Sequence, residues 1–239
     1  DISVSILFRT YHIKGKRMLD KFLTPMIKPI LAPVVVVLHK RGITADQLTV
    51  AGFLIGMLAL PLLAFELWYG ALAVIVLNRI LDGLDGALAR YAQQSSSAGG
   101  YLDITLDFIF YAAVPLGFIL ANPEQNAIVG ALLLATFIGT GSSFLAFAIA
   151  AEKFKLDKPQ FKYKSFYYLN GLTEGTETIA LFVAFCIWPQ HFVLLASIFA
   201  TACAITIFTR IHGGYHTLKQ LEANVSSSAG LNSQEVSND

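Results

Sequence analysis

Long apolar runs separated by short polar stretches dominate the chain between residues 48 and 211. A transmembrane helix needs about 20 mainly apolar residues, because each residue adds about 1.5 Å toward a hydrocarbon core about 30 Å thick. Six runs approach or exceed this length: about 48–65, 70–91, 101–120, 127–151, 173–188 and 192–211. The pattern predicts an all-α integral membrane protein with six transmembrane helices.

The segments that flank these runs have a different pattern. Residues 1–42 place lysines and arginines between apolar residues at helical spacing, which predicts an amphipathic helix lying in the membrane interface. A short soluble helix packed on a partner is the alternative. Residues 215–239 end in a polar stretch without periodicity, and we expect this tail to be disordered. The predicted six-helix transmembrane domain between them spans residues 43–214.

Composition supports a membrane protein. The 239 residues are 55% hydrophobic and 14% charged, and the net charge is +1. No basic patch with interleaved aromatic residues is present, so nucleic acid is not expected as a partner. Cys186 and Cys203 lie in apolar runs without the spacing of a metal site, and we expect buried free thiols.

Lysine and arginine positions predict the topology. The turns at 66–69, 121–126 and 187–191 carry neither residue, whereas the amino-terminal segment, the 152–168 loop and the tail carry nearly all of them. With six spans these basic regions lie on one side, and the positive-inside rule makes that side cytoplasmic. Both termini are therefore expected in the cytoplasm, and the membrane is the plasma or inner membrane if the source is prokaryotic.

Four carboxylates interrupt the second and third runs. Asp82 and Asp85 are spaced i and i+3, and Asp103 and Asp107 are spaced i and i+4, so each pair projects from one face of its helix. Clustered carboxylates inside a membrane need cations to remain charged. Because all these ligands are oxygens, the stretch predicts Mg²⁺ or Mn²⁺.

Small residues and an arginine accompany the carboxylates. Gly86 and Gly99 would let a phosphate-bearing ligand approach the backbone, and Arg90 would offer a planar fork to phosphate. The whole stretch, read as Asp82-x2-Asp85-Gly86-x2-Ala89-Arg90-x8-Gly99-x3-Asp103-x3-Asp107, resembles the signature of the CDP-alcohol phosphotransferases (CDP-alcohol phosphatidyltransferases) at every defined position.

This resemblance implies an activity and assigns roles. It implies transfer of a substituted phosphate, generally phosphatidyl, from a CDP-alcohol such as CDP-diacylglycerol to an acceptor alcohol, with release of CMP, in phospholipid biosynthesis. It makes Asp107 the candidate catalytic base and includes that residue among the metal ligands. The metal ligands are Asp82, Asp85, Asp103 and Asp107, and the CDP-binding residues are Asp82, Asp85, Gly86, Ala89, Arg90 and Gly99.

A second segment matches the family only loosely. The family often has Thr-Pro-Asn-x-x-Thr near the first span, and this chain has Thr44-Ala45-Asp46-Gln47-Leu48-Thr49. Two interpretations stay open: the segment borders the nucleotide, or it caps the first helix.

The acceptor site is less defined. Lys153, Glu174, Glu177 and Arg210 are candidates for binding the acceptor. The lysines of the 152–168 loop would equally be attracted to anionic lipid, and the glutamates would equally suit a helix start. Small residues in the fourth run, including Gly130 and Gly139, allow close helix packing within the subunit or in a homodimer.

Two functions from other classes compete with the transferase. A cation transporter or channel would use the acidic cluster as an ion site, but carboxylates along a path through the bilayer would then be expected. A catalytically inactive scaffold would be expected to have lost at least one of the four aspartates, and none is missing.

Overall fold

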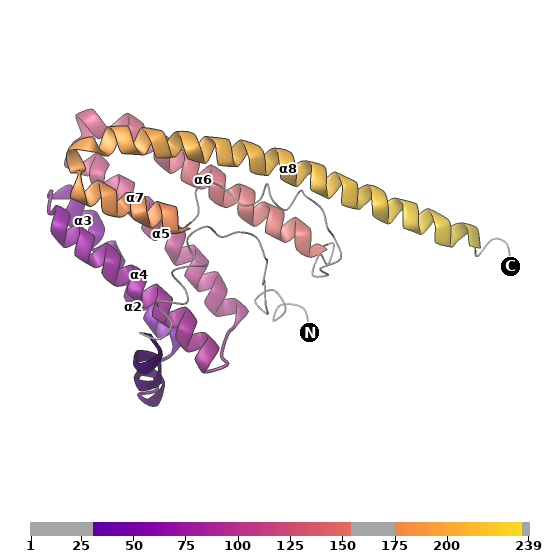
Figure 1. Cartoon of the computed structure of the whole chain (residues 1–239), viewed down its shortest axis with the longest axis horizontal. Helices are drawn as coiled ribbons and strands as arrows, with labels where there is room; N and C mark the ends of the chain where they lie inside the picture. Colours follow the sequence, from indigo (N-terminus) through magenta and orange to yellow (C-terminus); the bar gives the residue numbers. More distant parts are fainter. Residues whose placement is uncertain (1–30, 154–174, 236–239) are drawn as a thin grey trace. The chain divides into compact units, whose positions relative to one another are not determined.

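The computed structural model describes the backbone of residues 31–153 and 175–235, and every regular element among these residues is helical (Figure 1). The chain divides into two compact units. One comprises Asp1–Ala135 with Gly175–Phe199, and the other comprises Thr136–Glu174 with Ala200–Asp239. All four aspartates of the predicted site belong to the first unit. The all-helical fold class is confirmed for the described residues.

The first apolar run forms two consecutive helices, α2 (Ala45–Met57) and α3 (Ala59–Ala64). Thr44 begins α2 with a capping box: its hydroxyl accepts from the Gln47 backbone N–H at 3.3 Å, and the Gln47 side chain accepts from the Thr44 backbone N–H at 3.1 Å. This reciprocal pair satisfies two backbone donors that the first turn leaves without helical partners. Capping by Thr44 is therefore confirmed.

Helices α4 (Trp68–Tyr91) and α5 (Ser97–Ala121) carry the two halves of the carboxylate motif. Helix α4 ends in a left-handed turn at Gln93 (φ 55°), where the N–H of Gln94 donates to the carbonyl of Ala89. Ser96 then caps α5 by accepting from the Gly99 N–H at 3.0 Å. The apolar pattern predicts this span at about 101–120, but the serine cap starts the helix at Ser97.

The remaining elements are α6 (Pro123–Lys153), α7 (Gly175–Ile187), a short 3₁₀ helix (Pro189–His191) and α8 (Phe192–Glu235). Helix α8 extends past residue 214, so residues 215–235 are helical where we expected an irregular tail. No proline interrupts this segment, and its Lys, Gln, Leu, Glu and Ala residues favour helix. The boundary of the catalytic domain at 214 stays a prediction.

Four helical segments of the described chain are long and apolar enough to cross a membrane: Ala45–Ala64, Ser97–Ala121, Pro123–Ala151 and Pro189–Ala223. Helix α4 has 24 residues, or about 36 Å at 1.5 Å per residue, but it carries four charged residues. Helix α7 has only 13 residues. Membrane location follows from the four apolar segments, whereas the count of six spans and the side of the termini stay predictions.

Helix α2 contacts both α4 and α5, and α4 also contacts α7. Away from the carboxylates, aromatic side chains pack the first unit together. The Phe118 ring stacks on the Phe192 ring with centroids 4.6 Å apart, and the Phe185 and Phe192 ring centroids are 4.7 Å apart. These three rings are at most 1% exposed. Burial of such large side chains fixes α5, α7 and the start of α8 relative to one another.

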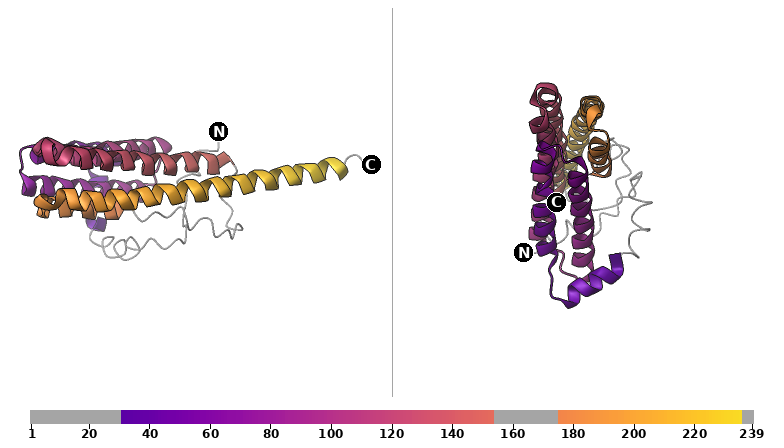
Figure 2. Two further views of the ribbon diagram at one scale, coloured as in Figure 1. Left: turned by 90° about the horizontal axis from the view of Figure 1, so that it is seen from above. Right: turned by 90° about the vertical axis from the view of Figure 1, so that its left-hand side faces the viewer.

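A further helix, Leu31–Lys40, lies at a steep angle to α4 (Figures 1 and 2). Its Val35 is buried with Leu48 of α2 and with Leu84 and Leu88 of α4. It therefore packs beside the end of α4 that carries Asp85. The amphipathic helix predicted for residues 1–42 lies mostly outside the described residues, and interfacial placement stays a prediction.

Glycines of α6 are used for packing within the subunit. A Cβ at Gly130 would lie 2.5 Å from a side-chain atom of Ile119 in the first unit, and one at Gly139 would lie 2.5 Å from Ile207 in the second. A larger residue at either position would therefore have to displace the isoleucine side chain that packs there. These contacts favour the intrachain alternative for the small residues, and a homodimer stays a prediction. Cys186 and Cys203 are buried free thiols, as predicted.

Candidate active site

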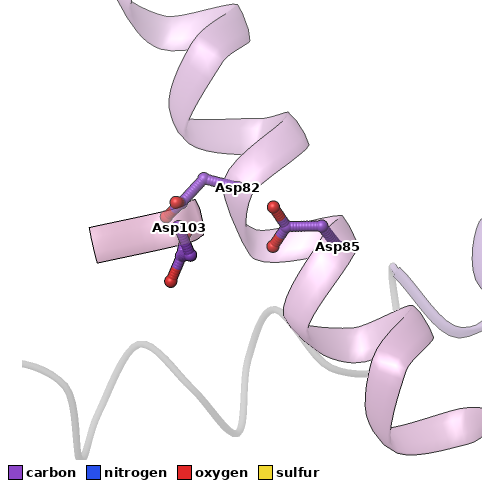
Figure 3. Close-up of side chains that lie close together, drawn as sticks. All are labelled: Asp82, Asp85 and Asp103. Atoms are coloured by element: carbon purple, nitrogen blue, oxygen red, sulfur yellow. The ribbon is translucent and has the colours of Figure 1, made fainter. Parts of the chain in front are cut away.

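Asp82 and Asp85 project from neighbouring turns of α4 toward Asp103 of α5 (Figure 3). One carboxylate oxygen from each residue lies within 4.8 Å of the others. Helix α2 contacts both of these helices. The structure thus brings together three of the four carboxylates that the sequence assigned to metal.

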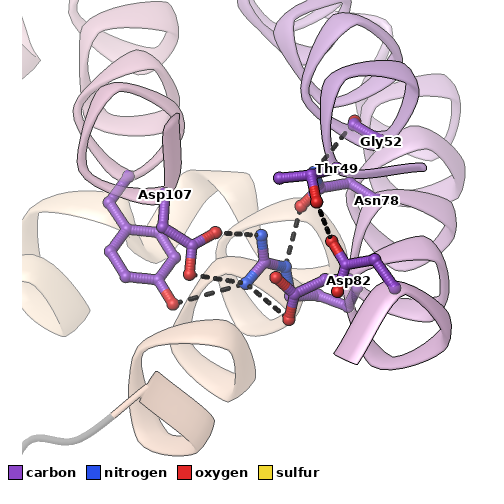
Figure 4. A network of polar contacts seen from close by, with 8 residues as sticks. Thr49, Gly52, Asn78, Asp82 and Asp107 are labelled. Carbon is purple, nitrogen blue, oxygen red and sulfur yellow. Dashed lines mark hydrogen bonds and ion pairs between the residues drawn. The ribbon is translucent and has the colours of Figure 1, made fainter. Parts of the chain in front are cut away.

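Asp85 is the most enclosed of the three, at 6% exposed. The Thr49 hydroxyl on α2 donates to its Oδ2 at 2.5 Å (Figure 4). The same oxygen of Thr49 lies 3.1 Å from the Ala45 carbonyl. A hydrogen bond to a charged acceptor is shorter and stronger than one between neutral groups. Thr49 therefore fixes the orientation of Asp85, and the loosely matching segment of α2 reaches the site through this residue.

Asp107 lies one turn further along α5 and forms an ion pair with Arg79 of α4. Arg79 Nη2 lies 2.6 Å from Asp107 Oδ1, and Nη1 lies 3.4 Å from Oδ2. Nη1 also lies 3.5 Å from Asp82 Oδ2. The guanidinium therefore lies between the predicted base and one predicted metal ligand.

The same arginine is linked to α2 through its neighbour in sequence. Arg79 Nε donates to Asn78 Oδ1 at 2.7 Å, and Asn78 Nδ2 donates to the Gly52 carbonyl at 2.9 Å (Figure 4). Asn78 is 3% exposed, so these bonds satisfy a buried amide. This chain of contacts fixes α4 against α2 at the level of the carboxylates.

A pocket opens at this cluster. Its lining comes from α2, α4 and α5: Thr49, Gly52, Phe53, Asn78, Arg79, Asp82, Asp85, Asp103, Leu106 and Asp107. All four predicted aspartates are among these residues. Two apolar side chains complete a cavity that is otherwise polar.

The other predicted CDP-binding residues lie beside this pocket rather than in its lining. The Arg90 guanidinium folds back toward Gly86, where a Cβ would lie 3.3 Å from Nη1. A Cβ at Gly99 would lie 3.0 Å from Asp46 Oδ1 and 3.2 Å from Ser96 Oγ. Ala89 follows on α4 and is half-buried. Gly99 therefore allows the starts of α2 and α5 to approach closely.

The predicted acceptor residues belong to different units of the chain. Glu177 is half-buried in the first turn of α7, within the unit that holds the aspartates. Arg210 belongs to the second unit, where it donates to the Thr140 carbonyl at 3.2 Å and lies over the Phe144 ring. Lys153, also of the second unit, is the last residue of α6. Glu174 lies outside the described residues.

The carboxylate motif did not identify three functional candidates: Thr49, Asn78 and Arg79. Each is a polar residue within an apolar helical run, which is costly in a membrane and therefore a signal of function. Their partners lie 26 to 36 residues away in sequence. Spacing along one helix cannot reveal such contacts.

The potential metal ligands of this site fit a hard divalent cation, such as Mg²⁺ or Mn²⁺. Three carboxylates supply oxygen ligands, and among the described residues neither His nor Cys lines the pocket. Two oxygens sharing one Mg²⁺ lie at most about 4.2 Å apart, because each bond is about 2.1 Å long. The 4.8 Å grouping needs only small side-chain movements to reach that geometry.

The family model for CDP-alcohol phosphatidyltransferases matches residues 42–209. This chain belongs to that family. The match begins just before α2, ends within α8 and includes both halves of the motif. The resemblance drawn from the motif is therefore confirmed, and so is the enzyme class.

Individual relatives extend the comparison. The chain is 60% identical to the inner membrane protein YnjF of Escherichia coli over 205 residues, which are 86% of this chain and 99% of YnjF. It is 35% identical to the archaetidylinositol phosphate synthase of Pyrococcus horikoshii over 144 residues, or 56% of this chain and 75% of the synthase.

Solved structures have the same fold. The phosphatidylinositol phosphate synthase PgsA1 of Mycobacterium tuberculosis with bound CDP-DAG aligns with a TM-score of 0.59 at 21% identity, covering 78% of this chain and 94% of that one. The same synthase in complex with manganese and citrate aligns with a TM-score of 0.58 at 21% identity, covering 77% and 88%.

Proposed function

We propose that this protein transfers a phosphatidyl group from CDP-diacylglycerol to an acceptor alcohol and releases CMP. The observation that carries this proposal is the grouping of Asp82, Asp85 and Asp103 in one pocket with Asp107 beside them. Family membership favours the transferase over the cation transporter that the sequence left as an alternative. The mycobacterial synthase binds CDP-DAG in its solved structure, which supports the choice of donor.

In the proposed site, Asp82, Asp85 and Asp103 hold Mg²⁺ or Mn²⁺, with two ions expected. Divalent metal neutralises the pyrophosphate charge and stabilises the attacking and leaving oxygens. Thr49 fixes Asp85 through its 2.5 Å hydrogen bond. A carboxylate that is already oriented loses less side-chain freedom when it binds the metal. Groups that hydrogen-bond to metal ligands influence metal affinity in this way.

The proposed CDP-binding edge of the pocket is formed by Gly86, Ala89, Arg90 and Gly99. Arg90 is exposed at the end of α4, and its guanidinium folds over Gly86. A phosphate that displaces this folded contact would gain two parallel hydrogen bonds from the guanidinium. The acyl chains of the donor would remain in the bilayer beside the apolar outer faces of the helices.

The transfer exchanges one bond at phosphorus for another. The acceptor oxygen bonds to the phosphorus that carries the diacylglycerol, and the bond from that phosphorus to the bridging pyrophosphate oxygen breaks. CMP leaves with the bridging oxygen, and Asp107 accepts the proton of the acceptor hydroxyl. A base aligned in this way contributes about 10²–10⁴ to the rate.

A phosphorylated polyol such as inositol phosphate is the proposed acceptor class. The support is that the Pyrococcus relative is named an archaetidylinositol phosphate synthase and another, from Streptomyces avermitilis, a phosphatidylinositol phosphate synthase. Glu177, at the start of α7, is the described acceptor candidate in the unit that holds the aspartates. The basic regions of the sequence support a site that opens to the cytoplasm, where CMP and a soluble acceptor exchange.

The test uses the full chain reconstituted in phospholipid vesicles with CDP-diacylglycerol and Mg²⁺. Inositol phosphate, glycerol phosphate, inositol and serine are added separately, and CMP and the lipid product are measured. CMP release that depends on one acceptor and stops in Asp85→Asn supports the proposal. Absence of CMP release with every acceptor, from protein that binds Mn²⁺ and unfolds cooperatively, overturns it.

A further inference from the structure

Two histidines lie one turn apart on α8. His212 and His216 are spaced i and i+4, both are exposed, and their ring centroids are 4.5 Å apart. This spacing places the two side chains on one face of the helix. Both belong to the second unit of the chain, whereas the aspartates of the candidate active site belong to the first.

The distance between the two rings suits a shared metal ion. An imidazole nitrogen lies about 2.0–2.1 Å from Zn²⁺ and the ring centre about 1.2 Å beyond it, so two rings on one tetrahedral ion have centres about 5 Å apart. The 4.5 Å separation on α8 is close to that value. Small rotations of the side chains are therefore enough to bring one nitrogen of each ring to the same ion.

Neighbouring aromatic rings restrict the two imidazoles. The Phe208 ring is stacked on the His212 ring, with centroids 6.3 Å apart and an interplanar angle of 11°. The Tyr215 ring lies edge-on to the His216 ring, with centroids 5.8 Å apart. A side chain whose rotamers are already restricted loses less conformational entropy when it binds a ligand.

The pair also lies where ions from water can reach it. His212 follows Phe192, the first residue of α8, by 20 residues, or about 30 Å at 1.5 Å per residue. This rise equals the thickness of the hydrocarbon core, about 30 Å. A helix that crosses the bilayer from Phe192 therefore brings His212 and His216 to the boundary with water.

The turn between the histidines is a weak point of the helix. It contains Gly213 and Gly214, and glycine is less favourable in a helix interior than every residue except proline. A Cβ at Gly214 would lie 3.1 Å from Phe147 Cδ2, so α8 passes close to α6 within the second unit here. A metal ion held by residues 212 and 216 would bridge this turn and stabilise it.

We propose that His212 and His216 form a two-histidine site for a borderline divalent cation such as Zn²⁺, which stabilises the glycine turn of α8. Imidazole suits Zn²⁺, whereas the carboxylates of the candidate active site suit Mg²⁺ or Mn²⁺. Two protein ligands leave the other positions of the ion to water or to a further donor. The proposal goes beyond the transferase activity and does not depend on it.

The experiment measures Zn²⁺ binding to the full chain without a histidine tag, by calorimetry in excess Mg²⁺, which competes for the carboxylates. The decisive variant exchanges two exposed residues, His216→Gln with Gln220→His. It keeps the composition but moves the histidines eight residues apart, or about 12 Å along the helix. His191→Gln is the matched control, because His191 is exposed and has no histidine one turn away in sequence.

The wild type and His191→Gln should bind one Zn²⁺ per chain with the same affinity. The exchange variant should bind it about tenfold more weakly or worse, because the second ligand no longer acts within the same turn. Zn²⁺ should also raise the unfolding temperature of the wild type more than that of the exchange variant, since an ion stabilises the state that binds it.

Equal Zn²⁺ affinity in the wild type and the exchange variant would overturn the proposal, as would absence of Zn²⁺ binding to the folded wild type. One ion per two chains would also overturn it, because the ion would then be held between copies. An equal rise in unfolding temperature would contradict the stabilisation of the turn. If the exchange variant does not fold, His216→Ala takes its place, and the same loss of affinity is expected.

Discussion

The Thr49 hydroxyl on α2 donates to Oδ2 of Asp85 on α4 at 2.5 Å, across 36 residues of sequence. This contact links the start of the first apolar run to the most enclosed carboxylate of the site. It also gives a physical role to the segment Thr44–Thr49, whose first threonine caps α2 and whose last orients a proposed metal ligand. Capping and proximity to the active site are thus compatible in this segment.

Removing the hydroxyl should weaken metal binding without changing the set of ligands. Thr49→Val keeps the shape of the side chain but leaves Asp85 without its donor, so Mn²⁺ affinity should fall about 10- to 100-fold. Thr49→Ser keeps the hydroxyl and should remain close to wild type. Mn²⁺ titration of the two variants makes the comparison, and equal affinity in Thr49→Val and Thr49→Ser would contradict it.

Packing between α3 and α5 depends on a glycine. A Cβ at Gly117 would lie 2.7 Å from Leu63 Cβ and 3.2 Å from the Leu60 carbonyl oxygen. Gly117→Ala should therefore lower the free energy of unfolding by about 1–3 kcal/mol, because neither helix backbone can yield easily. Thermal unfolding of the full chain in detergent provides the measurement.

Gly83→Ala is the control for this substitution. Gly83 is exposed on α4, and a Cβ there would meet only Leu31 Cδ1 at 3.9 Å, an ordinary contact. Alanine favours helix over glycine by about 0.5–1 kcal/mol, so this variant should unfold at the wild-type temperature or above it. Similar destabilisation by both changes would show that the effect at Gly117 does not come from the contact with Leu63.

Much of the site could be predicted from sequence because it is encoded locally. Asp82 and Asp85 share one face of α4 because they are spaced i and i+3. Asp103 joins their grouping once α5 is rotated so that this residue faces α4. The apolar runs likewise gave the order of the helices. The network around Arg79 could not be predicted, because its contacts to Asp107 depend on how two helices are rotated and offset.

Helix ends were less predictable than helix positions. Ser96 starts α5 earlier than expected, since a single side-chain hydrogen bond to Gly99 determines where the helix begins. At the other end of the chain, α8 continues to Glu235 although the apolar pattern stops near 211. A polar sequence without proline can continue a helix, so loss of hydrophobic periodicity does not mark its end.

Arg90 should bind phosphate through its geometry as well as its charge. Its guanidinium lies near Gly86 at the edge of the pocket, and Arg90→Lys keeps the charge but loses the two-point fork. A hydrogen bond to a charged group contributes about 1.5–3 kcal/mol, so kcat/KM for CDP-diacylglycerol should fall by about tenfold or more. Arg41→Lys, at an exposed position, is the matched control. Wild-type kinetics for both Arg90→Lys and Arg90→Ala would make Arg90 peripheral.

The clearest separation of binding from chemistry compares Asp85→Asn with Asp107→Asn. Asp85 belongs to the grouping of three carboxylates, so its loss should reduce Mn²⁺ affinity, and binding of CDP-diacylglycerol should fall together with turnover. Asp107 is held by Arg79 outside that grouping. Asp107→Asn should therefore keep Mn²⁺ and donor binding, whereas kcat should drop about 10²–10⁴-fold through loss of the proton acceptor.

Titrations of Mn²⁺ and of CDP-diacylglycerol on both variants, together with CMP release, make this comparison. If Asp107→Asn loses Mn²⁺ as thoroughly as Asp85→Asn, Asp107 is a fourth metal ligand and the assignment of the base is wrong.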